Sequence, residues 1–282
     1  MGYSIFINLY NFCITYVRCD IGIYRQLSRV FDELGPFDYV YNCAAEFGRW
    51  NGEDYYENLW KTNAIGVKNL IRLQEKFGFR LIHFSSSEVY GYPQVFPTPE
   101  TENLSIPNPY NPRFSYSASK IIGELLCINF AKKYGFKHTI VRYHNIYGPN
   151  MGHEHVMPQF IRKLIKNEEF LVEGDGTETR SFCFIDDAIA GTLLVHDDNS
   201  NGERIFNIGN DAESSILDLI NLLSEVSGKN INPKFKLKEN AGTKRRKPDI
   251  SKAKSVGYIP KIALRDGLKI TYDWYSKFYK NN

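Results

Sequence analysis

Short apolar runs alternate with longer amphipathic stretches through the first half of the chain. The runs cover residues 38–45, 80–85 and 138–142, and each has the length of a buried strand. Between them, residues 62–77 and 116–134 carry apolar positions at helical spacing. Strands that alternate with helices of this length predict crossover units and an α/β fold with a parallel sheet. In the first helix Val67, Leu70, Ile71 and Gln74 stand at helical spacing. The expected apolar face of the second helix is Ile121, Ile122, Leu125, Leu126 and Phe130.

The pattern changes after Gly148 and Pro149, where elements become shorter and turns more frequent. A strand at 204–208 is expected to rejoin the main sheet. The chain therefore predicts a main domain over 1–147, rejoined by about 181–210, and a smaller lobe formed by 148–180 and 211–282. The other expected elements are a strand at 170–173, helices at 156–167, 186–195 and 214–227, the last capped by Ser214 or Ser215, and a final helix from about residue 260.

Composition narrows the function classes. The chain has 282 residues, 43% hydrophobic and 24% charged, which fits an ordinary globular protein. Its net charge of +3 suits a small anionic substrate, whereas the absence of a dense basic stripe argues against nucleic acid. No apolar run reaches membrane-spanning length, so we expect no membrane association.

Neither cysteine nor histidine spacing suggests a metal site. The five cysteines are scattered and odd in number, which predicts reduced thiols in a cytoplasmic protein. His153 and His155 flank Glu154 in a loop next to glycine and proline, and further ligands are not nearby. We expect a plain loop there and no metal. The cysteines are Cys13, Cys19, Cys43, Cys127 and Cys183.

Small and polar residues follow three of the expected strands. Ala44 and Ala45 come after the first, residues 85–87 (SSS) end the second, and residues 143–145 (YHN) follow the third. Ligands of open parallel sheets bind at the carboxyl ends of the strands. We therefore expect these three groups to lie along one edge of the sheet.

Tyr116 and Lys120 are four residues apart in an expected helix, so they share one face. A free tyrosine, with a pKa of about 10, is a poor base at neutral pH. A nearby positive charge lowers that pKa. We expect Lys120 to hold Tyr116 close to its phenolate form, and a hydroxyl of the serine run to bridge the tyrosine and a substrate. Together these groups predict an active site.

The motifs, taken in order, resemble those of the extended short-chain dehydrogenases/reductases, the NAD-dependent epimerases, dehydratases and decarboxylases of nucleotide sugars. The resemblance runs from about Tyr16 to the C-terminus. It implies a Rossmann-like domain for the first part, a sugar-nucleotide lobe for the second, NAD as cofactor and a nucleotide-diphosphate sugar as substrate. The matching segments are 19–21 (CDI), 42–45 (NCAA), 85–91 (SSSEVYG), 116–120 (YSASK), 142–149 (RYHNIYGP), 176–182 (GTETRSF) and 246–250 (RKPDI).

The resemblance also implies a role for each matching position. Tyr116 would be the catalytic base, Lys120 would hold it and the nicotinamide ribose, and Ser86 would bond to the sugar 4-hydroxyl. Each of these residues could also have a purely structural role. Asp20 and Asn145 are common in turns, the two alanines allow close packing, and Arg180 could be an ordinary surface residue. The implied cofactor contacts are Asp20 and Ile21 at the adenine, Ala44, Ala45 and Tyr143 at the nicotinamide, and Ser85; the implied substrate contacts are Ser87, Asn145, Arg180 and Arg246.

Members of that family also form homodimers through the helix that carries Tyr-x-x-x-Lys and the helix before it. We therefore expect a homodimer. Leu73, Leu126 and Phe130 are candidate contacts, although ordinary core packing would explain them equally well.

One family motif is missing. The family opens with a Gly-x-x-Gly-x-x-Gly turn that places backbone N–H groups against the pyrophosphate of NAD. Residues 1–19 contain a single glycine, Gly2, and the first strand-helix-strand unit is absent, so residues 3–10 would supply one strand at most. Two explanations compete: a truncated or misplaced start, or a degenerate relative that no longer binds NAD tightly and is not catalytic.

Glu88, directly after the serines, bears on the reaction that follows oxidation at sugar C4. A carboxylate there can move a C5 proton, and the resemblance associates it with dehydratases and hexuronate decarboxylases. A salt bridge is the bland alternative. The arginine of segment 246–250 resembles one that sits by the sugar carboxylate in decarboxylases, and an arginine fork suits a carboxylate. The sequence favours a decarboxylase slightly over a 4,6-dehydratase, with a 4-epimerase third.

Overall fold

The main sheet has four strands in the order β10-β5-β4-β3. They are β3 (Tyr39–Asn42), β4 (Arg80–Ser86), β5 (His138–Tyr143) and β10 (Ile205–Ile208). β3 and β4 run parallel, with Tyr39 opposite Arg80. The sheet is mostly parallel and flanked by helices, so the α/β, Rossmann-like fold expected from the sequence is confirmed, as is the return of residues 204–208 to the main sheet.

The structure is a computed structural model that describes residues 4–9, 12–47, 54–196, 204–236 and 243–281. The chain forms two compact units. The first contains residues 1–91 and 104–141, and the second contains residues 92–103 and 142–282. The chain passes from the first unit to the second within β5. The dinucleotide-binding and sugar-binding roles predicted for the two parts of the sequence stay predictions.

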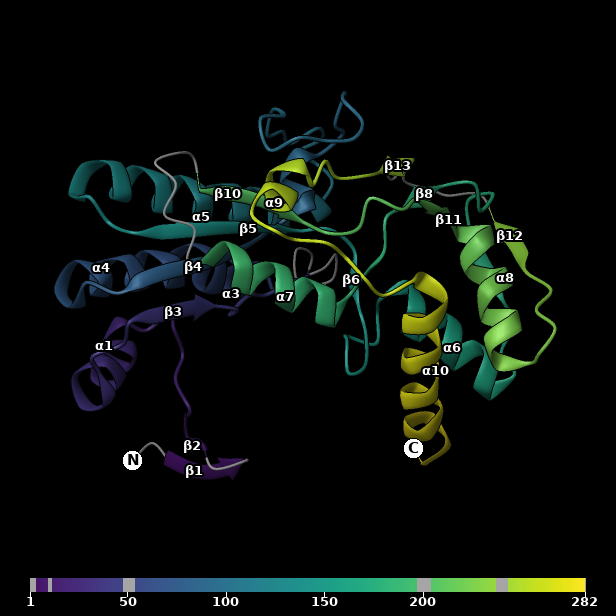
Figure 1. Cartoon of the computed structure of the whole chain (residues 1–282), viewed down its shortest axis with the longest axis horizontal. Helices are drawn as coiled ribbons and strands as arrows, with labels where there is room; N and C mark the ends of the chain where they lie inside the picture. The colour runs from purple at the N-terminus through teal and green to yellow at the C-terminus, as the bar shows by residue number, and fades with distance from the viewer. Residues whose placement is uncertain (1–3, 10–11, 48–53, 197–203, 237–242, 282) are drawn as a thin grey trace. The chain divides into compact units, whose positions relative to one another are not determined.

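The helices of the first unit cover its strands (Figure 1). Burial in α4 follows the predicted pattern, because Val67, Leu70, Ile71 and Gln74 are all buried. Both α4 and α5 end at a glycine in the left-handed conformation, Gly78 and Gly135, which is how many helices terminate. The elements are α1 (Tyr24–Leu34), α3 (Tyr56–Trp60), the π-helix η1 (Lys61–Gly66), α4 (Val67–Phe77), the 3₁₀ helix η2 (Ser87–Tyr90) and α5 (Arg113–Tyr134).

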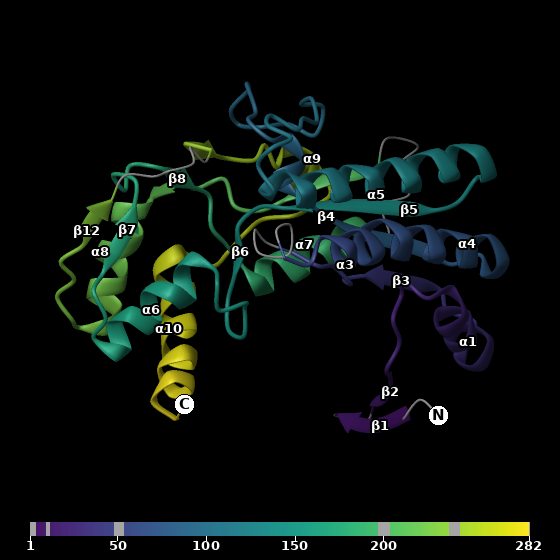
Figure 2. The ribbon, with the colours of Figure 1, turned by 180° about the vertical axis from the view of Figure 1, so that it is seen from behind.

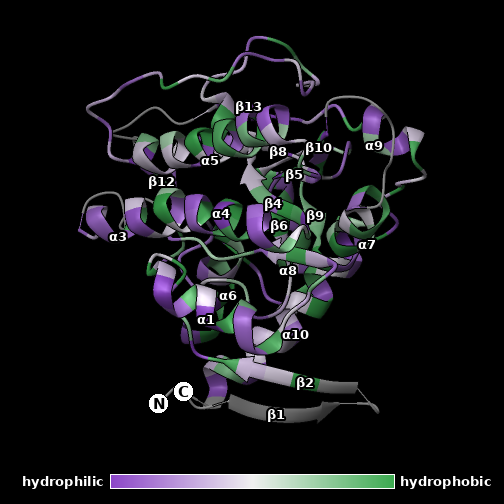
Figure 3. Ribbon diagram, turned by 90° about the vertical axis from the view of Figure 1, so that its left-hand side faces the viewer, coloured by the Kyte–Doolittle hydropathy of each residue, from purple (hydrophilic) through white to green (hydrophobic). Residues whose placement is uncertain are grey.

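The predicted apolar face of α5 is wrong. Ile122 and Leu125 are exposed, and Ile121, Leu126 and Phe130 are only partly buried. The helix instead buries a face that contains several polar side chains, and hydrophilic and hydrophobic residues both line its ribbon in Figure 3. Polar groups can be buried when they find hydrogen-bond partners, and those of α5 do. The buried residues are Phe114, Ser117, Ser119, Lys120, Gly123, Glu124 and Cys127.

The beginning of the chain forms a hairpin. β1 (Ser4–Leu9) and β2 (Phe12–Val17) pair antiparallel in a two-stranded sheet of their own. The single strand expected from residues 3–10 is thus present, but it pairs with β2. Among the described residues ahead of β3, none adds a strand to the main sheet.

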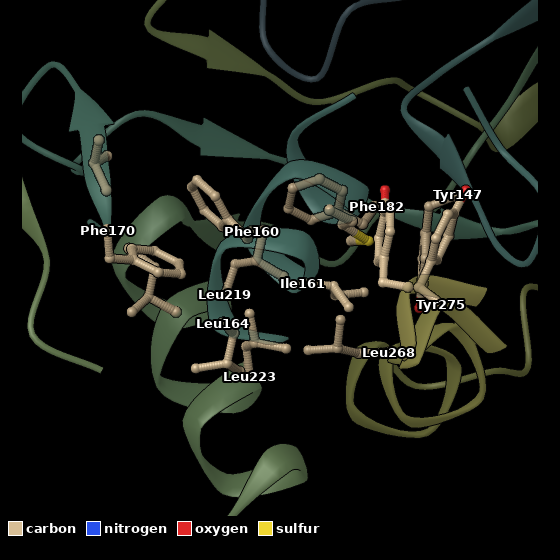
Figure 4. Packing of buried hydrophobic residues seen from close by; sticks show 14 of the residues in the cluster. Tyr147, Phe160, Ile161, Leu164, Phe170, Phe182, Leu219, Leu223, Leu268 and Tyr275 are labelled. Atoms are coloured by element: carbon tan, nitrogen blue, oxygen red, sulfur yellow. The ribbon is translucent and has the colours of Figure 1, made fainter. Parts of the chain in front are cut away.

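The second unit has its hydrophobic core among three helices. Figure 4 shows side chains of α6, α8 and α10 pointing toward one another, including Ile161, Leu223 and Leu268, and Figure 2 shows the same helices from behind. Ser215 caps α8 in a capping box with Asp218, which confirms one of the two predicted N-caps. The helices are α6 (Val156–Lys166), α7 (Ile185–His196), α8 (Ile216–Ser227), α9 (Ser251–Ser255) and α10 (Leu264–Asn281).

Three small sheets complete the second unit, in the orders β11-β8-β13, β12-β7 and β6-β9. Helices and strands therefore lie close to their predicted positions, whereas most of these two-residue strands were not predicted. The strands are β6 (Ile146–Tyr147), β7 (Leu171–Glu173), β8 (Thr179–Arg180), β9 (Cys183–Phe184), β11 (Ser214–Ser215), β12 (Lys234–Lys236) and β13 (Arg245–Arg246).

Asn207 of β10 ties residues 92–103 into the second unit. Its backbone N–H donates to Glu100 Oε1 (2.8 Å), and its side-chain amide donates to the carbonyls of Thr98 (3.0 Å) and Asp249 (3.1 Å). Thr98 N–H in turn donates to the carbonyl of Lys247 (2.8 Å). Asn207 is fully buried, so these bonds replace the water it would otherwise hold. They fix the segment that follows β13.

Candidate active site

Ser86, Tyr116 and Lys120 meet in the first unit, as predicted. Ser86 ends β4, and its hydroxyl is hydrogen-bonded to the Tyr116 phenol. Lys120 lies one helical turn beyond Tyr116, with its Nζ 5.8 Å from the centre of the tyrosine ring. The same ammonium donates to the carbonyl of Phe84 (2.7 Å), which anchors it beneath the strand. Helix α5 and the end of β4 therefore present the expected catalytic groups together.

The pKa of Tyr116 moves in the opposite direction to the prediction. Burial raises it to about 12, the hydrogen bond from Ser86 lowers it, and the negative charge of Glu88 raises it. Burial also lowers the pKa of Lys120 to about 8, although Cys43 and Glu124 act to raise it. A tyrosine removed from water ionises reluctantly, and here that effect outweighs any help from the lysine. These effects favour the protonated phenol of Tyr116 at neutral pH.

The other serines of the run face the protein interior. Ser85 Oγ donates to Glu124 Oε1 (2.5 Å), and both residues are buried. Ser87 begins η2 and is 8% exposed. Their predicted contacts, cofactor for Ser85 and substrate for Ser87, stay predictions. Ser85 has a visible structural task, because it gives the buried carboxylate of Glu124 a hydrogen-bond donor.

Glu88 is paired with Arg113, the first residue of α5. Arg113 Nη2 lies 2.8 Å from Glu88 Oε1, and Arg113 Nε lies 3.2 Å from Oε2. Ser117 Oγ also donates to the Glu88 backbone carbonyl (2.6 Å). The salt bridge considered as the alternative role of Glu88 is thus present, beside Tyr116. Sequence analysis did not single out Arg113, because an arginine that follows a proline in a loop gives no signal of its partner.

Asn63 is a second residue that sequence analysis missed. It lies in the π-helix η1, is 1% exposed, and holds both backbone groups of Glu46: its Oδ1 accepts from N–H (2.9 Å) and its Nδ2 donates to the carbonyl (2.8 Å). Nδ2 also donates to Ser119 Oγ on α5 (2.9 Å). π-Helical turns often mark functional sites. The one available signal was a buried-type position occupied by asparagine within a predicted helix.

Asp20 and Ile21, expected at the adenine, lie just before α1. Asp20 Oδ1 accepts from Gly22 N–H (2.8 Å), the turn contact considered as its alternative, and Oδ2 accepts from Lys61 Nζ (2.6 Å). The hydrogen bond from Lys61 holds the pKa of the Asp20 carboxyl below its usual range. Ile21 packs on Gly66, where a side chain would collide with it, and its carbonyl accepts from Asn69 (2.9 Å). Lys61 therefore joins η1 to the predicted adenine end.

The described residues fit the reacting end of NAD better than its middle. Lys120 makes one hydrogen bond within the described structure, and an ammonium has three donors, so two remain for ribose hydroxyls. Ala44 and Ala45 follow β3 and are small enough to admit a flat ring. The chain has no Gly-x-x-Gly-x-x-Gly segment, and α1 begins after Ile23 with no side-chain cap. A glycine cradle for the pyrophosphate is therefore missing from the described residues.

Arg180 and Arg246 stand opposite each other in the second unit, in the parallel pairing of β8 with β13. Arg180 Nη1 donates to the carbonyls of Thr179 (2.7 Å) and Lys244 (3.3 Å), and Arg246 Nη2 donates to Thr243 Oγ1 (3.3 Å). Arg246 is 9% exposed, which is unusual for a charged side chain. Arg180, predicted at the diphosphate, and Arg246, predicted at the sugar carboxylate, therefore lie side by side. Both ligand contacts stay predictions.

Asn145 and Tyr143 have structural partners in the same unit. Asn145 adopts a left-handed conformation (φ 46°), and its Nδ2 donates to the carbonyl of Ser181 (3.4 Å), so it does form the turn considered as its alternative role. The Tyr143 hydroxyl is hydrogen-bonded to Thr192 Oγ1 on α7 (2.7 Å). Their predicted ligand contacts stay predictions.

Other features of the sequence have a structural explanation. His153 packs against the rings of Tyr275, Phe278 and Tyr279 and is hydrogen-bonded to the Tyr279 hydroxyl (2.7 Å). In the described part of the chain, no three side chains of His, Cys, Asp or Glu gather as metal ligands would. Within that same part, no helix is both long and apolar enough to span a bilayer. Cys19, Cys43, Cys127 and Cys183 are free thiols; the side chain of Cys13 lies outside the described structure.

The fold and the Ser-Tyr-Lys group define the class of protein. Residues 6–209 match the NAD dependent epimerase/dehydratase family, and the chain belongs to this family. It is 36% identical over 217 residues to UDP-glucuronic acid decarboxylase 3 of Arabidopsis thaliana, with 74% of this chain and 61% of that protein covered. It is 34% identical over 252 residues to UDP-N-acetyl-alpha-D-glucosaminuronate decarboxylase of Bacillus cytotoxicus, with 86% and 78% covered.

Solved structures share the fold. The UDP-glucuronic acid 4-epimerase of Bacillus cereus in complex with UDP-glucuronic acid and NAD is 30% identical, with a TM-score of 0.77 over 90% of this chain and 79% of that one. A UDP-glucose 4-epimerase of Thermotoga maritima with UDP-glucose is 31% identical, with a TM-score of 0.82 over 93% and 84%. The chain spans only 61% of the length of the plant decarboxylase.

Proposed function

We propose that the protein is an NAD-dependent enzyme that oxidises C4 of the sugar in a nucleotide-diphosphate sugar and then acts at C5 or C6. The observation that carries the proposal is the group formed by Ser86, Tyr116 and Lys120 at the end of β4, with Glu88 beside it. Relatives named as nucleotide-sugar decarboxylases, and solved 4-epimerases bound to UDP sugars, support the same substrate class.

Each group of the first unit has a definite task in this reaction. The Tyr116 phenolate takes the proton of the sugar 4-hydroxyl, and Ser86 hydrogen-bonds to the same hydroxyl and orients it. Lys120 supplies positive charge that stabilises the phenolate. Lys120 would hold the nicotinamide ribose of NAD, which would supply acceptance of the C4 hydride when bound. The charged form of Lys120 counters the burial that disfavours ionisation of Tyr116.

The step after oxidation distinguishes the candidate reactions. A ketone at C4 turns a C6 carboxylate into a β-keto acid, which loses carbon dioxide, and it also acidifies the C5 proton. In this proposal Glu88 moves the C5 proton, and Arg246 binds a carboxylate through its guanidinium fork. The names of the relatives favour decarboxylation of a UDP-linked uronic acid. A 4,6-dehydratase is the second candidate, and a 4-epimerase is the third.

A non-catalytic relative is the candidate from a different class. The missing glycine cradle favours it, because that cradle supplies a principal contact to the pyrophosphate. The presence of Ser86, Glu88, Tyr116 and Lys120 opposes it.

The proposed enzyme would work in a reduced, cytoplasmic environment. The four free thiols among the described residues suit such an environment.

The proposed assembly is a homodimer through α4 and α5. Ile122 and Leu125 of α5 are exposed, and Leu126 and Phe130 are partly exposed, so an apolar strip is available for a second copy. Leu73 of α4 is completely buried and belongs to the core, so it is not a contact. Leu125→Glu should turn a dimer into a monomer in analytical ultracentrifugation, while the exposed control Lys132→Glu should not.

The reaction is tested by incubating the full chain and NAD with each donor separately and weighing the products by mass spectrometry. The donors are UDP-glucuronate, UDP-N-acetylglucosaminuronate, and the UDP, dTDP and GDP derivatives of hexoses. Loss of carbon dioxide identifies a decarboxylase, loss of water a dehydratase, and a chromatographically distinct product of unchanged mass an epimerase. A chain that binds none of these donors in calorimetry would instead support the non-catalytic relative.

A further inference from the structure

The pairing of Arg113 with Glu88 has the geometry of a two-point fork. Arg113 reaches Oε1 through Nη2 (2.8 Å) and Oε2 through both Nε (3.2 Å) and Nη2 (3.1 Å). The Glu88 side chain is 18% exposed and that of Arg113 is 35% exposed, so water screens the pair less than it screens most surface pairs. A planar guanidinium that holds both oxygens fixes the plane of the carboxylate as well as its charge.

Both partners lie next to the reacting tyrosine. Arg113 precedes Tyr116 by three residues on α5, so the two side chains share a face of the helix. Glu88 follows Ser86, which is bonded to Tyr116, and its charge opposes ionisation of the phenol. The Lys120 ammonium lies 5.8 Å from the centre of the Tyr116 ring, and Cys43 and Glu124 act to raise the pKa of Lys120. Tyr116 therefore has both a carboxylate and an ammonium near it.

This arrangement contains a conflict. The proposed reaction needs a carboxylate at position 88 for the later proton transfer, yet the first step needs Tyr116 to become an anion close to it. A carboxylate and a phenolate that lie close together repel each other, and partial burial strengthens the repulsion. A fixed positive charge on the carboxylate relieves it, and Arg113 supplies that charge.

We propose that Arg113 is a positioning residue that holds the Glu88 carboxylate in one orientation and offsets its charge beside Tyr116. The proposal rests on the proposed function, because it takes Tyr116 as the base and Glu88 as the later proton carrier. Its electrostatic part concerns only residues of this chain and needs no substrate. The competing role is purely structural, a tie between η2 and α5. Ser117 already provides such a tie through the Glu88 carbonyl.

The electrostatic part is tested by NMR on the full chain labelled with ¹³C at the tyrosine Cζ. The Tyr116 signal is identified by its loss in Tyr116→Phe, and its ionisation is followed from about pH 9 to above pH 12, because burial raises its pKa to about 12. Glu88→Gln removes a negative charge and keeps the positive charge of Arg113, so Tyr116 should ionise at lower pH than in the native chain. Adding Arg113→Gln to that variant should raise the midpoint again by roughly one pH unit.

The control is Arg72→Gln, which breaks an exposed pair with Glu75 on α4 of the same unit and should leave the Tyr116 signal unchanged. Circular dichroism at each pH confirms that the variants are folded. Identical Tyr116 midpoints in Glu88→Gln and in the double variant would overturn the proposal. Arg113 would then be a structural tie only.

The orientational part is tested by turnover of the donor that the native chain accepts. Arg113→Gln should lower kcat by about tenfold or more and change KM little, because misplacing a group affects the reacting geometry rather than binding. Arg113→Lys keeps the positive charge but cannot hold both carboxylate oxygens. Its Tyr116 midpoint should therefore equal that of the native chain, while its kcat should be as low as that of Arg113→Gln. Native kcat in Arg113→Gln would refute this part. If the native chain converts no donor, the proposed function fails, and the NMR comparison still decides the role of Arg113.

Discussion

Arg246 lies directly opposite Arg180 across two parallel strands, β13 and β8, and both guanidinium groups belong to the same small sheet. Like charges directly opposite each other across a sheet are unfavourable, and negative groups of a ligand offset that cost. We expect the substrate to supply such groups to both, its diphosphate to Arg180 and its sugar carboxylate to Arg246. Each arginine replaced by glutamine should weaken nucleotide-sugar binding by about 1.5–3 kcal/mol, the usual value for a hydrogen bond to a charged group.

Isothermal calorimetry with UDP and a UDP sugar, at two salt concentrations, measures this effect. Arg265→Gln is the matched control, because Arg265 is an exposed arginine of the same unit that pairs with Glu225 on α8. The losses in the double variant Arg180→Gln/Arg246→Gln should not simply add, since neighbouring residues that bind the same ligand are energetically coupled. Native affinity in both single variants would remove these arginines from the binding site.

Tyr116→Phe should abolish turnover and leave the affinity for the sugar nucleotide nearly unchanged. In the proposed reaction the phenolate oxygen takes the proton, whereas the ring itself remains in place and still packs beside Lys120. Steady-state kinetics measures the first effect and calorimetry the second. Tyr134→Phe, on the same helix and about 27 Å farther along it, is the control and should be fully active. Turnover by Tyr116→Phe would refute its assignment as the base.

Lys120→Met should stabilise the fold near neutral pH. Burial lowers the pKa of Lys120 from 10.5 to about 8, so the unfolded chain binds this proton more tightly than the folded chain does. The resulting cost is fully present below pH 8 and disappears as the pH rises toward 10.5. Its size is about 3 kcal/mol. Loss of the hydrogen bond to Phe84 offsets roughly 1 kcal/mol of the gain at every pH.

Urea unfolding at a series of pH values checks this prediction. The free-energy difference between Lys120→Met and the native chain should shrink between pH 8 and pH 10.5. Lys132→Met, an exposed lysine on the same helix, should show no such change. A difference that is constant with pH would mean that Lys120 is not charged at a cost in the folded chain.

His83→Leu should make the first unit more resistant to acid. His83 is buried beneath α5, where Gly123 leaves room for its ring, and burial lowers its pKa from 6.5 to about 3. Below pH 6.5 the unfolded chain takes up a proton that the folded chain does not, so stability is lost as the pH falls from 6.5 toward 3. At pH 5 this loss amounts to about 2 kcal/mol, and the leucine variant should not suffer it.

The partner of His83 complicates the comparison, because Asn42 is buried and hydrogen-bonded to its ring (3.3 Å). The double variant His83→Leu/Asn42→Val removes both partners and avoids an unsatisfied amide. Thermal melts between pH 4 and pH 7 should be flatter for both variants than for the native chain. An unchanged slope would show that another group dominates acid unfolding.

Periodicity predicted most of the long elements because burial on one face writes a repeat into the sequence. The apolar positions of α4 and the return of residues 204–208 to the main sheet are examples. Periodicity failed on α5, where the buried face carries several polar side chains. Ser117, Ser119, Lys120 and Glu124 are buried there because each has partners that only the folded chain brings near, and a hydropathy pattern contains no information about those partners.

In the candidate site too, the sequence pattern predicted some features and missed those that depend on contacts formed in the fold. Tyr116, Lys120 and Ser86 were predictable because their chemistry depends on residue type and short spacing. The pKa of Tyr116 was not, since it depends on how much water the fold removes around the phenol. Asn63 and Arg113 were missed because their importance lies in contacts 56 and 25 residues away in the sequence. Single-residue patterns predict reactive groups well and the groups that hold them poorly.

The two units exchange chain three times, since residues 92–103 belong to the second unit and residues 104–141 return to the first. Neither unit is a continuous stretch of polypeptide, so no single cut would release one of them intact. A fragment that ends at residue 141 would carry residues 92–103 without Asn207 and Asp249, which hold them, and a fragment that begins at 142 would lack the segment altogether. The two units should therefore fold only as parts of one chain, and neither should be obtained as a stable fragment by truncation or by limited proteolysis at a single site.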